Sequence, residues 1–429
     1  MAVASGSMSE SNEKARVVEA NRAQLRLVAL DLEAALPEDH PARAVWSFVE
    51  GLELKPFYDR IGAREGKAGR PAIDPRIVLA LWIYATVEGV GSAREIERLS
   101  REHLAYQWIC GGVGVNHHSL SDFRNETVDL LNGLLTQSVT MLLRAGLIEL
   151  RRVAQDGMKV RAWAGASSFR TRKRLEKLEK IAREQVETLS KEIESDPGGG
   201  SKRQEAARKR AAEERAKRLA RALEQMAEVE QQRKRSNKSK RKKKAEARSS
   251  TTDPEARVMK MADGGFRPAY NVHFVSETEQ KVVVAVNVDN AGTDKHAMVA
   301  LAEQIEKRYP VRPEQWLADG GCNSLDNVEK MTRRNYTVFA PPQQRHSVER
   351  KPGQAVRGDS ESIRQWRARM ATEEAKMIYK QRGATAELVN AHCRGQGLLQ
   401  VLVRGTSKVL AVALLHALTI NMRRAWVFA

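Results

Sequence analysis

The sequence predicts a mixed α/β domain that is interrupted by a helical coiled-coil hairpin and preceded by an all-helical domain. Strand-length apolar runs alternate with amphipathic helices after residue 147, a long Lys/Arg/Glu-rich stretch with heptad-like spacing interrupts them, and short capped helices come before them. The predicted parts are 1–16 disordered, 17–147 helical, 148–169 and 251–400 α/β core, 170–250 hairpin with a basic linker, and 401–429 C-terminal helix.

The bulk composition favours a polyanionic partner. The 429 residues are 41% hydrophobic, which is enough for real cores, and carry a net charge of +19. Such an excess indicates nucleic acid first and an acidic membrane surface second, with a merely solvated basic surface as the plainer interpretation. Three scattered cysteines without a Cys-x-x-Cys pair argue against disulfides and structural zinc, and fit a reducing cytoplasm.

Neither a signal peptide nor a membrane-spanning segment is predicted from the sequence. The polar N-terminus lacks the apolar region of a signal peptide. The most apolar stretch, Val409 to Ile420, is too short to cross a bilayer and is expected to be a packed helix.

Short helices separated by glycine turns fill the N-terminal region. Asp74 and Pro75 open a helix over 76–88, Ser92 opens a second over 93–104, and Ser119 opens a third that is expected to run to about Ala145. A helix-turn-helix-like DNA-binding module and a plain helical bundle explain this pattern about equally well. The DNA-binding candidates here are arginines expected to be exposed, namely Arg94, Arg98 and Arg124.

The insertion is predicted to be an antiparallel coiled coil. Apolar residues recur three or four apart from Leu175 to Ile193 and again from Ala212 to Met226, and a Pro-Gly turn at 196–200 separates the two runs. A basic low-complexity segment follows at 233–244. It is either a contact to the DNA backbone or a soluble tether.

Five strands are expected in the α/β core. They cover 148–156, 269–275, 281–288, 315–319 and 336–340, with helices over 294–308 and 324–333 and from 365 onward. This order predicts a mixed five-stranded sheet with helices.

Two of these strands end in Asp-Gly, and these aspartates are the centre of the functional prediction. Asp156 and Asp319 are expected to emerge at the end of the sheet, and Glu387 lies in a helix. Each alone is more simply a turn former or a solvated residue, so the three are informative only jointly. Together they predict a site for two Mg²⁺ ions, with Mn²⁺ as a substitute, that supports displacement at phosphorus in DNA.

Other residues near this site are weaker candidates. On the helix of Glu387, Arg382 is placed to hold a phosphate and Tyr379 to stack or hydrogen-bond beside it. Asp289 and Asp294 flank a strand end and could lie nearby, although turn and cap roles are favoured for both.

The chain resembles the DDE transposases of bacterial insertion sequences, in the group with a Tyr-x-x-Arg…Glu…Lys/Arg signature. The matching stretches are Gln155-Asp156-Gly157-Met158-Lys159-Val160, Asp253-Pro254-Glu255-Ala256-Arg257, 263–271, Ala318-Asp319-Gly320-Gly321, and Tyr379-x-x-Arg382…Glu387…Arg394. A coiled-coil insertion in the core resembles that of one branch of the group. Two positions depart from the pattern: Arg394 stands where Lys is common, and Gly320-Gly321-Cys322 replaces Ala-Gly-Tyr.

The resemblance implies a ribonuclease H-like core, Mg²⁺ dependence, and a homodimer or higher multimer that binds terminal inverted repeats and target DNA. It makes Asp156, Asp319 and Glu387 the metal-binding and catalytic triad, and it implies a bacterial, nucleoid-associated cytoplasmic protein. The implied DNA contacts in the core are Tyr379, Arg382, Arg394 and Lys159. Two alternatives remain: a domesticated or inactive relative that only binds DNA, and a basic coiled-coil scaffold that binds nucleic acid passively.

Overall fold

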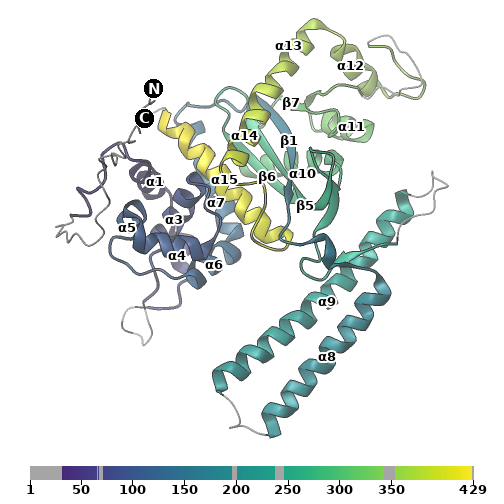
Figure 1. Ribbon diagram of the computed structural model, residues 1–429. Helices are drawn as coiled ribbons and strands as arrows, with labels where there is room; N and C mark the ends of the chain where they lie inside the picture. The colour runs from purple at the N-terminus through teal and green to yellow at the C-terminus, as the bar shows by residue number, and fades with distance from the viewer. Residues whose placement is uncertain are drawn as a thin grey trace, which may run out of the picture.

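The structure is a computed structural model that describes residues 31–64, 66, 71–195, 201–236, 246–342 and 353–427. The disorder predicted for 1–16, the turn at 196–200 and most of the basic linker lie outside the described residues. Figure 1 shows three parts: helices near the N-terminus, a sheet covered by helices, and a long helical hairpin that projects from the sheet.

Seven helices form the described part of the N-terminal region. They are α1 (Pro41–Glu50), α2 (Lys55–Asp59), α3 (Pro75–Val87), α4 (Ala93–Glu102), α5 (Leu104–Cys110), α6 (His117–Glu126) and α7 (Val128–Arg144). Helix α3 is buried on nearly every side, and its first turn is capped by Asp74, whose side chain accepts from the Arg76 amide. The region is therefore organised around α3.

The single helix expected from Ser119 to Ala145 is wrong, because the chain breaks between α6 and α7. Thr127 leaves the helical conformation (φ −112°, ψ 26°), and its hydroxyl donates to the Phe123 carbonyl at 2.6 Å. A threonine that bonds back to the preceding turn competes with the regular helix at that point. The apolar periodicity on both sides hides this break in the sequence.

The sheet, as far as the chain is described, has six strands in five positions. The strands are β1 (Arg152–Arg161), β4 (Arg257–Lys260), β5 (Phe266–Glu277), β6 (Val283–Asp289), β7 (Gln315–Ala318) and β8 (Thr337–Phe339). The order runs β5-β1-β7-β8, and β4 and β6 share the outer edge of β5, along 266–269 and 271–276 respectively. The mixed sheet with helices is as predicted, and β4 is a short addition that sequence analysis missed.

Helices cover both faces of the sheet. On one face α10 (Ala297–Arg308) and α11 (Leu325–Arg333) pack against Val153, Val275 and Trp316. On the other lie α13 (Glu373–Arg382), a π-helical turn (Gly383–Glu387), α14 (Leu388–Gly395) and α15 (Thr406–Val427), while α12 (Glu361–Met370) packs beside α11.

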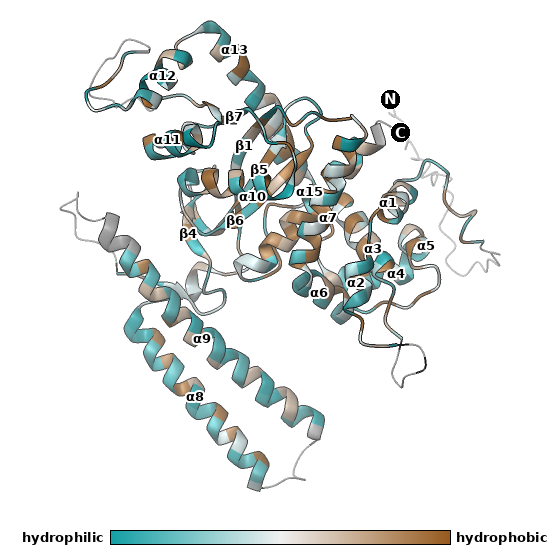
Figure 2. Cartoon of the chain, turned by 180° about the vertical axis from the view of Figure 1, so that it is seen from behind, coloured by the Kyte–Doolittle hydropathy of each residue, from teal (hydrophilic) through white to brown (hydrophobic). Residues whose placement is uncertain are grey.

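Helix α15 joins the sheet to the N-terminal helices. It packs against α3, α6 and α7, and its Asn421 side chain hydrogen-bonds both backbone groups of Val283 in β6, at 2.7 and 2.8 Å. Figure 2 shows apolar residues concentrated on α3, α7, α15 and the strands. The stretch singled out as a packed helix is thus the shared core element, and no helix in the described part of the chain is long and apolar enough to cross a membrane.

The predicted hairpin consists of α8 (Arg172–Ser195) and α9 (Lys202–Ser236), which pack along each other. Its own small core is Leu175, Ala182, Leu219, Ala222 and Met226. At its base, Arg172 forms a two-point ion pair with Glu230, both at 2.9 Å. A two-stranded neck of β2 (Phe169–Arg170) and β3 (Ser249–Ser250) closes the insertion against the core.

Because Arg170 and Ser249 are paired at the neck, removal of 171–248 with a short glycine splice should leave the rest of the chain folded. The deletion chiefly deprives the core of the interactions of Arg257 with Gln225 and Glu228, so we expect a cost of about 1 kcal/mol in the free energy of unfolding. Chemical denaturation of both proteins measures it. Loss of cooperative unfolding in the shortened chain would show that the hairpin is structural.

Candidate active site

Two parallel strands bring the two aspartates together. Strands β1 and β7 pair from Arg152↔Gln315 to Gln155↔Ala318, so Asp156 and Asp319 are the next residues along each strand. Ala154 and Leu317 are paired and pack in the same small cluster, so the aspartates two residues further on share that face of the sheet. Each carboxylate accepts from the amide of its following glycine, at 3.0 and 2.6 Å.

Asp156 does not end its strand, as the sequence suggested, but lies inside it. The partner β5 is long and continues to pair with β1 as far as Arg161↔Ala269, whereas β7 stops at Ala318. Beyond Gln155, β1 thus loses its neighbour on the β7 side while keeping the one on the β5 side. The aspartate sits at this step in the sheet, where a side chain can reach a site beyond β7.

Burial and neighbouring charges act in opposite directions on Asp156. Burial raises the pKa of its carboxyl group, and the carboxylates of Asp319 and Asp294 raise it further, while the Arg382 guanidinium and the Gly157 amide oppose the shift. Like charges gathered at one place disfavour ionisation unless a cation balances them. A positive charge close to these carboxylates would therefore stabilise their ionised form.

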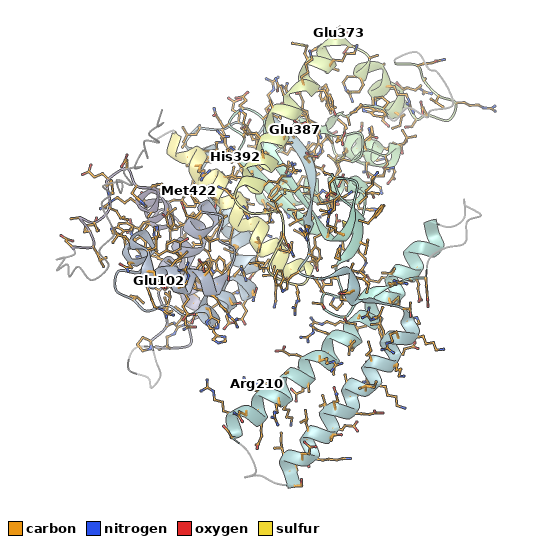
Figure 3. The ribbon with its side chains drawn as sticks, viewed as in Figure 1. Glu102, Arg210, Glu373, Glu387, His392 and Met422 are labelled. Atoms are coloured by element: carbon orange, nitrogen blue, oxygen red, sulfur yellow. The ribbon has the colours of Figure 1, made fainter. Side chains whose placement is uncertain are left out.

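The segment of Glu387 supplies the positive charge present in this structure. The Arg382 guanidinium lies 3.4 Å from an Asp156 oxygen and 3.8 Å from a Glu387 oxygen, and Asn390 donates to the other Asp156 oxygen at 2.9 Å. Arg382 and Asp156 are largely buried, but the Glu387 side chain is 72% exposed. Figure 3 shows Glu387 on the helical segment beside β1, with Glu373 at the outer end of α13.

A π-helical turn joins α13 to α14 and replaces the regular helix expected around Glu387. It covers Gly383–Glu387, where the buried Thr385 donates to the Thr278 carbonyl at 3.4 Å and Ala386 packs with Ala154 and Leu317. Isolated π-helical turns occur frequently at functional sites. Here the turn docks the segment onto β1 and β7 and so sets where Arg382, Glu387 and Asn390 lie.

Asp294 lies in the site, although sequence analysis favoured a turn or cap role for it. Asn271 donates to its carboxylate at 2.6 Å. A Cβ atom added to Gly157 would lie 2.6 Å from that same oxygen and 3.0 Å from Nδ1 of the buried His273. The helix-initiating position of Asp294 was visible in the sequence, but its closeness to Gly157 depends on the pairing of β1 with β5.

The remaining candidates fall into three groups. Tyr379 is close enough to the two aspartates for their charges to raise its pKa, although burial is the larger cause. Lys159 is half-buried on β1 opposite Asn271, and Arg394 is exposed on α14. Arg94 and Arg98 lie on α4 among the N-terminal helices, far from α13 in Figure 1.

The structure contradicts one detail of the prediction and adds context to two others. Arg124 is only 5% exposed, so its expected exposure is wrong; it packs over Trp82 inside the fold, where burial lowers its pKa to about 10. Arg98 is exposed but bound to Glu95 and Glu102 on its own helix. Cys322, at the departure from the Ala-Gly-Tyr pattern, is fully buried in the core that α10 and α11 cover.

The donor chemistry of the site fits Mg²⁺, which prefers carboxylate oxygens. Asp319 and Asp294 are near enough for their charges to raise the pKa of Asp156, and Glu387 is linked to Asp156 through Arg382. Among the described residues, however, no three His, Cys, Asp or Glu side chains stand in an arrangement that could hold a metal ion. In this conformation Glu387 faces Arg382 and solvent, so a complete cage needs its side chain to turn.

Comparison with protein families identifies two parts of the chain. Residues 30–126 match the family described as Transposase domain (DUF772), and residues 239–422 match Transposase DDE domain. No curated protein and no solved structure gave a match. The second range begins within the linker after α9, so it includes Asp319 and Glu387 but leaves out β1 and Asp156.

The sheet and its covering helices form a ribonuclease H-like core, and the two matches assign transposase domains to parts of the chain. Residues 239–422 carry a transposase DDE domain and residues 30–126 a transposase domain of the DUF772 family, with β1 and the α8–α9 hairpin between the two ranges. Such a domain implies DNA transposase activity, and proteins with it generally use a divalent metal.

We expect Gly157→Ala to destabilise the protein by about 1–3 kcal/mol, because the new methyl group would collide with Asp294 and His273. Gly133→Ala is the matched control, since nothing lies within 4 Å of its Cβ position in α7 and the change should stabilise by about 0.5–1 kcal/mol. Urea unfolding of both variants measures the two effects. If Gly157→Ala leaves the free energy of unfolding unchanged, Asp294 does not lie in close contact with Gly157.

Asp156→Asn should stabilise the metal-free protein at pH 7. A folded-state pKa above the ordinary value means that the ionised form is disfavoured by folding, and the amide removes that penalty. The advantage should shrink as pH falls through the folded pKa and vanish below the unfolded value of 3.8, where the wild-type carboxyl becomes protonated in both states. Denaturant unfolding in EDTA across this range checks the sign; a variant less stable at pH 7 contradicts it.

Proposed function

We propose that this protein is an insertion-sequence transposase that binds the terminal inverted repeats of its element and catalyses metal-dependent strand cleavage and strand transfer. The observation that carries the proposal is the meeting of Asp156 and Asp319 on adjacent parallel strands, with Arg382, Asn390 and Glu387 docked over them. Matches to two transposase families support it. The N-terminal helices, within 17–147, are proposed as the DNA-binding domain.

Asp156, Asp319 and Glu387 would hold the metal ions, and Asp294 is placed to contribute a further oxygen. Two bound Mg²⁺ ions, or Mn²⁺ in their place, would stabilise the charge on the attacking and leaving oxygens at phosphorus. The chain's own residues orient these groups: Asn390 fixes one Asp156 oxygen, and the Gly157 and Gly320 amides fix the rotation of the two aspartates.

Arg382 is the proposed phosphate contact. It is largely buried, charged, and placed between two carboxylates, and its Nε has no hydrogen-bond partner within the described part of the chain. An arginine fork matches the oxygens of a phosphodiester. We propose that Arg382 neutralises the carboxylates in the free protein and turns to DNA phosphate when substrate binds, with Tyr379 beside it and Lys159 and Arg394 along the same path.

Asp156→Asn and Glu387→Gln should each abolish strand cleavage and leave DNA binding largely intact, because each keeps the shape of the side chain and removes one charged oxygen ligand. A nicking assay on duplex DNA with the element ends, in Mg²⁺, measures cleavage, and a mobility-shift assay measures binding. Glu373→Gln is the control for Glu387→Gln, because Glu373 is an exposed glutamate of the same helical segment.

The outcomes separate this proposal from its alternatives. Wild-type nicking that both variants lose supports an active transposase. Binding without cleavage by the wild type points to an inactive relative that only binds DNA. Unchanged nicking by either variant rejects the assigned triad.

A further inference from the structure

A cavity of about 150 Å³ lies where the N-terminal helices meet the turn between α14 and α15. Its polar lining comes from Thr86 on α3, Arg124 on α6, Gln396 at the end of α14, Gln400 between α14 and α15, and His416 on α15. Thr86 and Gln400 already donate to backbone carbonyls, those of Trp82 and Ala162. It lies on α3, α6 and α15, and Arg124 is the one residue among the predicted site residues that lines it.

Two glycines, one in each of two turns that line this cavity, allow those turns to pack closely against each other. Gly89 and Gly397 both have positive φ, at 74° and 89°, and a Cβ at 397 would lie 3.0 Å from the Gly89 carbonyl oxygen. The turn after α3 and the turn after α14 therefore touch backbone to backbone. This contact holds the Gln396 backbone against the turn after α3, at the edge of the cavity that Arg124 also lines.

Arg124 brings a buried positive charge without a negative partner. Its Nη1 donates to the Gly91 carbonyl at 3.0 Å and its guanidinium lies 4.3 Å from the Trp82 ring, while Nε has no partner among the described residues. None of the residues lining the cavity, all of them described, is acidic. With a pKa of about 10 the guanidinium remains protonated at neutral pH. A buried charge of this kind is costly unless something pairs with it.

Gln396 and His416 add hydrogen-bonding groups that are also unused. Gln396 is 6% exposed, and neither its amide nitrogen nor its amide oxygen has a partner in the described structure. The Nδ1 of His416, a residue that is 5% exposed, is likewise unpaired within the described ranges. Buried polar atoms are nearly always bonded in folded proteins, so four such atoms around one cavity indicate a missing partner.

We propose that this cavity binds a phosphate group. A tetrahedral oxyanion accepts hydrogen bonds from several directions at once, as Arg124 Nε, Gln396 Nε2 and the Nδ1–H of a neutral His416 ring would offer them, and it balances the guanidinium charge. Burial lowers the pKa of His416 to about 4, so its ring contributes a hydrogen bond and no charge. A hydroxyl of the monoprotonated ion can donate to Gln396 Oε1. The group could be free inorganic phosphate or the terminal phosphate of a DNA strand, which share this chemistry.

Isothermal titration of the full-length protein with inorganic phosphate, at ionic strength matched with chloride, tests the proposal. A second titration uses one short oligonucleotide in two forms, with a 5′-phosphate and with a 5′-hydroxyl. Both forms make the same contacts through the rest of the strand, so any difference in affinity comes from the terminal phosphate. We expect one of these two probes to bind, and Gln396→Met, which keeps the shape but removes both polar atoms, to weaken that binding at least tenfold. Arg124→Gln should abolish it.

Arg333→Gln is the control for lost charge, because Arg333 is exposed on α11, does not line the cavity and belongs to neither the N-terminal helices nor the candidate active site, so phosphate binding should be unchanged. Gln396→Met keeps the test valid if Arg124→Gln does not fold. Binding of free phosphate identifies the ion itself, and a gain limited to the 5′-phosphorylated strand identifies the DNA end. The proposal would be overturned if neither probe binds, if Gln396→Met binds the probe as tightly as the wild type, or if acetate binds as tightly as phosphate. If neither probe binds, water is the occupant of the cavity.

Discussion

The parallel pairing of β1 with β7 is the constraint on which the candidate site depends. Asp156 and Asp319 are 163 residues apart in the chain, yet they follow directly on the paired residues Gln155 and Ala318. The pairing is reinforced where Trp316 Nε1 donates to the buried Gln155 side chain at 3.0 Å. Because side chains alternate along a strand, a shift of one residue in this register would move one aspartate to the opposite face of the sheet.

The site holds like charges close together, and the rest of the fold supports that arrangement. Carboxylates from the strands and from the start of the α10 segment are gathered at one edge, and burial raises the pKa of Asp156. In the free protein a single guanidinium, Arg382, serves both Asp156 and Glu387. The π-helical turn places it there, and the same turn leaves Glu387 exposed on the outer side. In the proposed function, this arrangement is the metal-free state, and the acidic groups would regroup around a bound cation.

Local sequence patterns predicted the elements but not the contacts between them. Val-rich runs such as 281–288, the heptad-like spacing from Leu175 onward and the Asp74 cap each depend on neighbours within a few residues, and all correspond to observed elements. The Asp-Gly pairs and Glu387 were found as candidates because acidic residues after apolar runs are locally visible. Their strand-end positions made a joint metal site a hypothesis, and the resemblance added their assignment as a catalytic triad.

What could not be predicted depends on partners distant in sequence. Asp156 lies inside its strand because β5 extends past β7, Asp294 reaches the site because Gly157 leaves room for it, and Arg124 is buried because Trp82 and Gly91 enclose it. No periodicity within α6 distinguishes a buried arginine from an exposed one.

The hairpin shows how an insertion can divide a site in sequence without dividing it in space. The hairpin leaves the core just after β1 and returns before β4. Because the β2–β3 neck pairs Phe169 with Ser250, the two ends of the insertion lie side by side, and the core strands are joined as they would be by a short loop. Lengthening a closed loop costs little additional entropy once its ends are fixed. The family match to the DDE domain begins after the hairpin, and β1, which supplies Asp156, is nevertheless central in the sheet. The matched range therefore omits β1, although the pairing of β1 with β7 is what brings Asp156 next to Asp319.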